Sequence, residues 1–368
     1  MIWRYIADDG VTASFGLAAD EVVTRRQGTG QSPPSLRLYT YRSHCALVGR
    51  FQRVPSEIDL DVCAAHDIQV NRRPTGGGAI IMGADQLGVA IMVPERRTSD
   101  AYDRTRDLFA RFSEGIVRAL GTLGIAAEFR RKNDIEVRGR KVAGLGLYFD
   151  PAGGLLFHAS LLVDLDIAFM LRVLRTPFEK ISDKEIATVA ERMTTIRRET
   201  GRPVTVDEVR QRLRDAYAEV LADGLARATF APDELAEIDA LERGRYTTAA
   251  WVGQEPATPD AMGSATLKTE GGLLSAHLTL AGDVLKVVYL TGDFFCDEAV
   301  VAGLERALRW HPSHPDAVAT TLEALRERDG LAIPRVPADA LARVIGMAVD
   351  GARRNVQGAQ GKGCFVNP

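Results

Sequence analysis

Hydrophobic and polar residues follow two different periods along the first half of the chain. A helical period predicts helices over residues 14–25, 59–66 and 103–123. Short runs rich in apolar and β-branched residues predict strands, which span residues 36–41, 45–49, 69–72, 88–93, 134–137, 141–149 and 155–162. Because many strands follow one another through short turns, we expect an α+β fold with a mixed, mostly antiparallel sheet flanked by helices.

The pattern changes after Thr176, where helical periods predominate. The predicted helices span residues 183–192, 205–227 and 232–245. Residues 253–259 (GQEPATP) form the clearest linker. Beyond it, predicted strands at 265–269, 272–280 and 284–290 precede predicted helices at 297–308, 314–328 and 338–350. We therefore expect a main domain over residues 1–245, a small α+β domain over 246–352 and a flexible tail over 353–368.

Composition narrows the class of protein. The net charge of −3 offers no global field for nucleic acid or an acidic membrane, so any anion site must be local. No run approaches the roughly 18 to 20 apolar residues that span a bilayer, and the first residues lack a signal-peptide apolar core. The four cysteines have no metal-like or redox-like spacing. These features predict a cytoplasmic protein that works without nucleic acid or membranes.

The most informative motif is RRPTGGGAII, residues 72–81. Three successive glycines weaken a strand, but they suit a place where a ligand approaches the backbone and N–H groups cradle an anion. The two preceding arginines add planar cations that suit phosphate or carboxylate. The alternative is a flexible hairpin turn. The spacing of a Walker loop is absent.

A second motif, KNDIEVRGRKVAG, occupies residues 132–144. Asp134 is a hard oxygen ligand of the kind that Mg²⁺ accepts when substrate phosphates complete its shell. Lys141 lies between a glycine turn and an apolar strand, where a fixed ammonium would stabilise charge on an α-phosphate or carboxylate. The alternative is a solvated basic hairpin made by Arg138, Arg140 and Lys141.

A third feature is His158, inside the apolar run LFHASLL. The alternative is a satisfied core histidine. Six histidines without an i,i+4 pair give little support to a metal hydrolase. The G-x-S-x-G elbow is absent, and the Gly144-Leu145-Gly146 run lacks the third glycine of a dinucleotide fingerprint.

Taken in order, these segments resemble the lipoate–protein ligase branch of the biotin/lipoate ligase superfamily. That family carries R-R-x-x-G-G-G-A, N-D-[IL]-x-V, R-K-[VI]-x-G and a histidine-containing strand. The chain matches these patterns at residues 72–79, 133–137, 140–144 and 158–162. Residues 48–52 (VGRFQ) look like a further family segment, and the second domain is similar to the family's accessory domain. The resemblance implies a class II synthetase-like fold.

The resemblance also implies a reaction. ATP and Mg²⁺ would convert lipoate or octanoate to an acyl-adenylate, and the acyl group would pass to a lysine of a lipoyl-carrier domain, such as a 2-oxoacid dehydrogenase E2 or the glycine cleavage H protein. Lys141 would be the central electrostatic catalyst, and Asp134 would serve Mg²⁺. The residues implied to hold substrate and nucleotide are Arg73, Gly76, Gly77, Gly78, Ala79, Ile80, Ile81, Asn133, Asp134, Gly144 and His158. Apolar residues around Val142, Leu145 and Leu147 are expected to face the acyl chain.

The chain departs from the family pattern in three places. Met82 and Gly83 stand where His-Asp is common, residues 157–160 read FHAS instead of H-H-G-T, and Ala143 replaces a serine. These changes leave the acyl chain and the carrier open.

The closest alternative is an octanoyltransferase of the same fold. Such enzymes form a cysteine thioester and use no ATP, and this chain has no cysteine at residues 128–131 or 169–178, where two branches carry it. A non-catalytic carrier-binding protein is a further alternative, which the retained Lys141 and glycine run disfavour.

Overall fold

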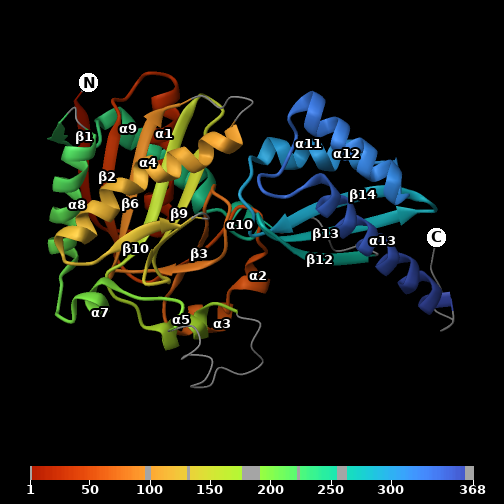
Figure 1. Ribbon diagram of the computed structural model, residues 1–368, viewed down its shortest axis with the longest axis horizontal. Coiled ribbons are helices and arrows are strands. Elements are labelled where there is room, and N and C mark those ends of the chain that lie inside the picture. The colour runs from red at the N-terminus through yellow and green to blue at the C-terminus, as the bar shows by residue number, and fades with distance from the viewer. Residues whose placement is uncertain are drawn as a thin grey trace. The chain divides into compact units, whose positions relative to one another are not determined.

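The structure, a computed structural model, describes residues 2–95, 101–130, 133–175, 191–221, 224–254 and 263–360. Its internal contacts divide the chain into two units (Figure 1). The first contains Met1–Val48, Val54–Pro74 and Ala79–Gly253, and the second contains Gly49–Arg53, Thr75–Gly78 and Gln254–Pro368. Two short loops from the first third of the chain therefore belong to the second unit.

An eight-stranded sheet forms the centre of the first unit. Its strands, in spatial order, are β11 (Leu225–Arg227), β1 (Trp3–Val11), β2 (Ser35–Tyr41), β6 (Gln86–Pro94), β10 (Gly154–Leu162), β9 (Arg140–Phe149), β8 (Asp134–Val137) and β7 (Ala127–Arg130). Strand β1 pairs in parallel with both β11 and β2, whereas the remaining neighbours are antiparallel. The predicted mixed, mostly antiparallel sheet is confirmed.

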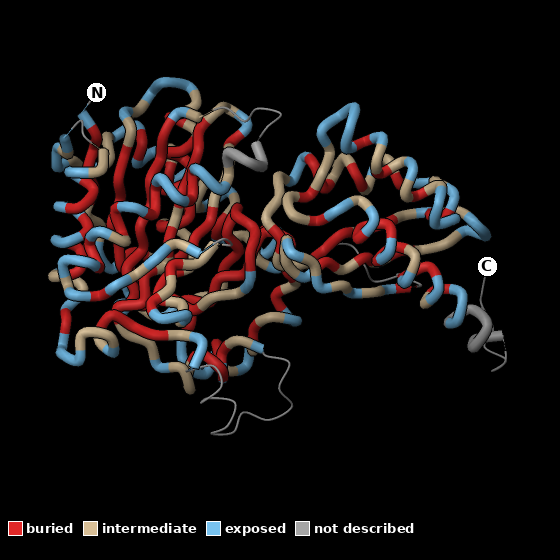
Figure 2. The backbone as a smooth tube through the Cα atoms, in the orientation of Figure 1, coloured by how far each residue is buried: buried red, intermediate tan, exposed pale blue. Residues whose placement is uncertain are grey.

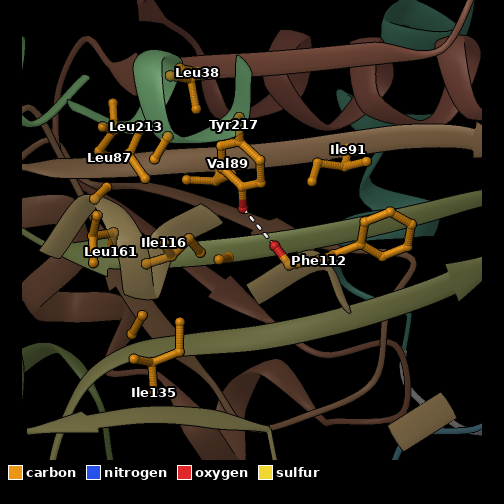
Figure 3. Packing of buried hydrophobic residues seen from close by; sticks show 14 of the residues in the cluster. Leu38, Leu87, Val89, Ile91, Phe112, Ile116, Ile135, Leu161, Leu213 and Tyr217 are labelled. Atoms are coloured by element: carbon orange, nitrogen blue, oxygen red, sulfur yellow. Dashed lines mark hydrogen bonds between the residues drawn. The ribbon is translucent and has the colours of Figure 1, made fainter. Parts of the chain in front are cut away.

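Helices pack against both faces of this sheet. Helix α1 (Ala13–Gly28) contacts β6 and β10, and α4 (Ala101–Thr122) packs with α8 (Val206–Val220) on the other face. Alternate residues of each strand enter each side, so Val89 and Leu161 join the α4–α8 core, while Met92 and Leu156 pack beside α1. Figure 3 shows the α4–α8 core, where the buried Tyr217 hydroxyl donates a hydrogen bond to the Phe112 carbonyl at 2.7 Å.

A smaller sheet of the first unit leads directly to the glycine run. It has the order β4 (Gln69–Arg72), β3 (Cys45–Val48), β5 (Ile80–Met82). Strands β3 and β4 are parallel neighbours, so their carboxyl ends meet at one edge of the sheet. The chain leaves those two ends into the loops Gly49–Arg53 and Thr75–Gly78 of the second unit.

Shorter helices complete the first unit. They are α2 (Val54–Glu57), α3 (Leu60–Ala65), α5 (Ile167–Val173), α7 (Ile196–Thr200), α9 (Pro232–Leu241), the π-helix η1 (Glu242–Tyr246) and α10 (Ala249–Val252). Figure 2 shows that buried backbone concentrates in the strands of the sheets.

The second unit is a small α+β domain. Its antiparallel sheet has the order β12 (Gly263–Thr269), β13 (Gly272–Ala281), β14 (Val284–Gly292) and β15 (His311–Pro312). Its helices are α11 (Glu298–Leu308), α12 (Pro315–Asp329) and α13 (Ala338–Gln360). Buried residues such as Leu274, Leu278 and Leu290 pack against these helices.

Several predicted elements differ from the structure. The helix predicted over 205–227 ends at Val220, and Leu225–Arg227 pairs instead with β1, because a free strand edge offers hydrogen bonds that a lone helix end does not. Strands β1, β5 and β7 were missing from the prediction, since β1 carries the polar run DDG and the other two are very short.

The end of the chain also differs. Helix α13 continues through Arg353 to Gln360, so the first half of the expected tail is helical, and residues 361–368 lie outside the described residues. The predicted helix 183–192 and linker 253–259 fall mostly outside them too. Among the described helices, none combines the length and apolar character needed to cross a membrane.

Candidate functional site

The hairpin between β8 and β9 determines where Lys141 lies. Its two-residue turn, Arg138 and Gly139, has positive φ at both positions, 51° and 76°, as in the tight turns that suit the twist of paired strands. The register then shifts: Ile135 is opposite Ala143, but Glu136 is opposite Lys141. This β-bulge adds one residue to β9 and turns Lys141 onto the face of the sheet that carries Gly144.

The Lys141 ammonium lies over a glycine and beside a carboxylate. Its Nζ is 2.6 Å from Asp134 Oδ1, and both side chains are about one-third to one-quarter exposed, at 34% and 26%. Among the described residues, that oxygen is shielded from solvent and has no hydrogen-bond partner besides this ion pair. A methyl group on Gly144 would lie 3.0 Å from Nζ, so the glycine provides the space that the lysine side chain crosses.

His158 and Ser160 lie on the same face, on the neighbouring strand β10. His158 is opposite Gly146, and Ser160 is opposite Gly144. A Cβ at Gly146 would lie 2.2 Å from His158 Nε2, so only glycine leaves room for this ring. Ser160 donates a long hydrogen bond, 3.5 Å, to the Gly144 carbonyl. Sequence reasoning missed Ser160, although its position two residues after His158 in a strand was a usable signal.

Burial and a nearby cation keep His158 neutral. Loss of water contact, followed by the positive charge of Arg73, lowers the pKa of His158 to about 3. Arg73 itself is buried, and burial lowers its pKa to about 10, which still leaves it charged at neutral pH. Its guanidinium donates to the Leu47 carbonyl at 3.0 Å. The structure thus brings the expected Arg73 and His158 into one electrostatic environment.

Arg72 has different hydrogen-bond partners from Arg73. It is fully buried, and its guanidinium donates to the carbonyls of Trp251 and Val252 at 3.1 and 3.4 Å, at the end of α10. Trp251 Nε1 donates back to the Arg72 carbonyl at 2.9 Å. Arg72 therefore fixes the chain just before the glycine run, rather than presenting a free cation as the motif suggested.

Other backbone atoms of the second unit approach the glycine run closely. A Cβ on Gly76 would lie 2.2 Å from the Phe294 carbonyl oxygen, and one on Gly49 would lie 2.1 Å from the Gly77 carbonyl oxygen. Gly77 has a φ of 92°, which favours glycine. Around Gly78 nothing would meet a Cβ within 4 Å. Thus the partner that approaches Gly76 is the protein's own backbone, and Gly78 is the open member of the run.

The loop Gly49–Arg53 is anchored in the same unit. Phe51 is buried and stacks on Phe294, with ring centroids 4.9 Å apart, and its carbonyl accepts from Gly292 N at 3.2 Å. Arg50 forms an ion pair with Glu298 and donates to Gln254 Oε1 at 2.7 Å.

Other predicted site residues serve the fold in part. Ile81 is opposite Ala46 in the small sheet, and both pack in one hydrophobic cluster, against which Ala79 also packs. Ile80 packs at the edge of the hydrophobic core beside α1. The Asn133 side-chain amide donates to the Leu145 carbonyl at 3.2 Å, which extends the pairing of β8 and β9.

The predicted acyl-facing wall is wrong. Val142 and Leu145 are buried in the α4–α8 core, and Leu147 packs against it, on the opposite face of the sheet from His158 and Gly144. The bulge and the strict alternation of strand side chains cause this difference.

The described residues offer few candidates for a metal site or a reactive thiol. No three His, Cys, Asp or Glu side chains cluster as a metal site within the part of the chain that the structure describes. Cys45 and Cys63 are buried, and burial raises the pKa of Cys63 to about 11 and that of Cys45 well above its ordinary value.

The sheet, its flanking helices and the ordered motifs define a member of the biotin/lipoate ligase superfamily. A family model described as the lipoyl protein ligase A/B catalytic domain matches residues 12–218, and the chain belongs to that family. It is an enzyme of the lipoate ligase and octanoyltransferase family.

Known relatives carry two different names. The octanoyltransferase LipM of Kyrpidia tusciae is 28% identical over 271 residues, which cover 68% of this chain and 97% of the relative. A bipartite lipoate protein ligase from Thermoplasma acidophilum, solved in a study with its E2 lipoyl domain, is 27% identical with a TM-score of 0.62, covering 69% and 98% of the two chains. A lipoate–protein ligase A bound with ATP is 26% identical with a TM-score of 0.59, covering 69% and 100%.

Proposed function

We propose that the protein is an ATP-dependent lipoate–protein ligase. The observation that carries the proposal is the Lys141 ammonium, held over Gly144 and 2.6 Å from Asp134 on two paired strands. A positive charge on such a rigid element can stabilise negative charge that develops during phosphoryl and acyl transfer. The ATP-bound relative supports the same nucleotide here.

The proposed reaction has two steps. A carboxylate oxygen of lipoate or octanoate attacks the α-phosphorus of ATP, and the bond to pyrophosphate breaks. The carrier lysine then attacks the acyl carbon, AMP leaves with the bonding electron pair, and the amine proton passes to solvent. Both steps gather negative charge on oxygens next to the α-phosphorus, so positioning and charge stabilisation supply the catalysis.

Each residue of the proposed site has a distinct role. Lys141 contacts the carboxylate and the α-phosphate. Arg73 contributes positive charge from its buried position, and neutral His158 lines the site without serving as an acid at neutral pH. Gly76 to Ile81 and Asn133 hold the nucleotide side, with Gly78 as the backbone position that a phosphate can approach.

Mg²⁺ fits this site only together with the substrate. Asp134 is the one carboxylate that we assign to it, and phosphate oxygens and water would complete the octahedral shell that Mg²⁺ requires. When bound, the ion would neutralise phosphate charge. Asp134 would then exchange part of its contact with Lys141 for the ion, and this would release the ammonium toward the acyl phosphate.

A second candidate is an ATP-independent octanoyltransferase, which the name of the LipM relatives favours. That reaction needs a thiolate nucleophile. The chain has four cysteines; Cys45 and Cys63 are buried, with raised pKa values that oppose thiolate formation. Cys296 is half-buried against the core of the second unit, and Cys364 lies outside the described residues. This disposition favours the ligase.

We further propose that the acceptor is a lipoyl-carrier domain, of the E2 or H-protein kind, in the cytoplasm. The Thermoplasma ligase, studied with an E2 lipoyl domain, supports this choice.

The decisive experiment measures ATP–pyrophosphate exchange with lipoate and with octanoate, in the wild type and in a variant with all four cysteines replaced by alanine or serine. The ligase predicts acid-dependent exchange in both proteins. Octanoyl transfer from an acyl-carrier thioester without ATP, lost in the cysteine-free protein, would establish the transferase. Carrier binding without either activity would establish the non-catalytic alternative.

A further inference from the structure

The backbone of Lys141 lies between two different neighbours. On one side the bulged pairing with β8 places Lys141 opposite Glu136. On the other side β10 no longer reaches it, because the β9–β10 ladder ends at Ala143 and Leu161. Residues 192–194 take that place: Lys141 N donates to the Arg192 carbonyl, and Thr194 N donates to the Lys141 carbonyl, both at 2.9 Å.

This short segment would be weakly held by two backbone hydrogen bonds alone. Glu199, five residues beyond Thr194, supplies further contacts. Its carboxylate accepts from the Thr194 hydroxyl at 2.5 Å, from Arg140 at 2.6 Å, and from Arg138. The Glu199 side chain is almost fully buried, at 2% exposed, whereas Arg138 is largely exposed.

The two arginines are not equivalent, and their positions explain why one carboxylate binds both. Arg138 is a turn residue with a φ of 51°, a backbone region that non-glycine residues seldom adopt. Arg140 begins β9, immediately before Lys141. By binding both, Glu199 holds the turn and the start of β9 to Thr194. Thus one carboxylate joins the two segments whose hydrogen bonds bracket Lys141.

We propose that Glu199 is a positioning residue for Lys141, acting through Arg138, Arg140 and Thr194 to keep the ammonium over Gly144. This rests on the catalytic role proposed above for Lys141. Burial raises the pKa of Glu199, but the hydrogen bonds from Thr194 and Arg138 and the charges of both arginines outweigh it and hold the pKa below its ordinary value, so the carboxylate stays charged at neutral pH.

The first test is independent of activity. Hydrogen–deuterium exchange of the full-length protein reports on the amides of Lys141 and Thr194. In Glu199→Ala both amides should exchange at least tenfold faster than in the wild type, while the amides of the α4–α8 core keep their protection. Unchanged protection at Lys141 and Thr194 would overturn the proposal, whatever the enzyme activity.

The second test measures acid-dependent ATP–pyrophosphate exchange. A displaced ammonium lowers kcat about tenfold to a hundredfold in Glu199→Ala, with less than a threefold change in KM for ATP, because small displacements near the reacting atoms chiefly affect the chemical step. Glu199→Gln, which keeps an acceptor for Thr194, should recover part of kcat. An unchanged kcat in Glu199→Ala, or a change confined to KM, would overturn the positioning role.

A matched control separates positioning from general loss of an ion pair. Arg202 and Glu208 form a two-point pair, at 3.0 and 2.5 Å, in the same stretch of chain, and no hydrogen bond joins them to Lys141 or residues 192–194. Glu208→Ala should leave kcat and the Lys141 amide unchanged. A wild type without any exchange activity would refute the proposed ligase function, while the deuterium experiment would still decide the role of Glu199.

Discussion

The two regions that the sequence singled out for chemistry, the Lys141 hairpin and the Gly76–Gly78 run, are built in opposite ways. Lys141 belongs to a strand of the large sheet, with backbone hydrogen bonds on both sides. The glycine run belongs to a loop of the second unit, where the Phe294 carbonyl lies close to the backbone of Gly76. One region obtains its precision from a sheet, and the other depends on a separate unit of the fold.

This difference has a chemical meaning under the proposed function. A cation that stabilises charge near the reacting atoms must be fixed before the substrate arrives, and paired strands provide that rigidity. A phosphate-binding loop must let a nucleotide reach its backbone, and the exposed Gly78, where a Cβ would meet nothing within 4 Å, suits that task.

Replacing the lysine tests the rigid region. Lys141→Ala should lower acid-dependent ATP–pyrophosphate exchange by at least about a hundredfold, because the charge that stabilises the developing oxyanion is lost. Lys141→Arg should recover little, since a planar guanidinium does not match the space over Gly144. Lys268→Ala, which removes an exposed lysine of β12, is the matched control and should leave the rate unchanged. Exchange that persists in Lys141→Ala would refute the assigned role.

Phe51→Ala tests how the second unit holds its loops. Phe51 is buried and stacks on Phe294, so its removal should lower the free energy of unfolding of that unit by about 3 kcal/mol, the usual cost of emptying an aromatic site. Thermal unfolding, monitored through deuterium exchange of β13 and β14, would measure this loss of stability. A change below about 1 kcal/mol would show that the loop is not anchored by this ring.

The paired variants Gly76→Ala and Gly78→Ala separate structural from ligand constraints. Gly76→Ala forces a methyl against the Phe294 carbonyl and should cost about 1–3 kcal/mol of stability. Gly78→Ala meets nothing and should leave stability within about 0.5 kcal/mol. If a phosphate approaches Gly78, the KM for ATP should nevertheless rise. Equal KM values in Gly78→Ala and the wild type would remove Gly78 from the nucleotide site.

His158 provides a pH test of the buried environment. Its folded pKa of about 3 lies below the unfolded value of about 6.5, so only the unfolded chain takes up a proton between those pH values. Stability is therefore lost as the pH falls below 6.5. Between pH 7 and pH 5 the wild type should lose about 1–2 kcal/mol more than His158→Gln. Urea unfolding at both pH values measures this, and parallel losses would show a solvated histidine.

The sequence predicted the site residues correctly where their partners lie close by in the chain. The order of the motifs pointed to Lys141, Asp134, Gly144 and His158, and the structure brings the lysine, the carboxylate and the glycine together because β8 and β9 are joined by a two-residue turn. Local sequence suffices where the partners are neighbours in one hairpin.

Contacts between residues far apart in the chain left no comparable pattern in the sequence. The Arg72-Arg73 pair looked uniform in the sequence, yet Arg72 binds carbonyls 179 and 180 positions away, whereas Arg73 remains near His158. The bulge puts Val142 into the α4–α8 core beside Ala143, and Leu145 and Leu147 enter the same core by the ordinary alternation of β9, so the expected acyl wall lies on the opposite face. One inserted residue reverses every subsequent side chain of a strand, and hydrophobic pattern alone does not locate it.

The sequence by itself determined most of the helices and strands, the α+β class and the set of polar residues suited to an acyl-activating reaction, because periodicity and turn chemistry are local properties. Only the tertiary structure decided that β11 joins the edge of β1, that Glu199 binds both arginines of the Lys141 hairpin, and that the glycine loop belongs to the second unit. Those contacts join residues far apart in the chain, and they form where folding brings a free strand edge, a buried charge or an aromatic ring to a partner that can satisfy it.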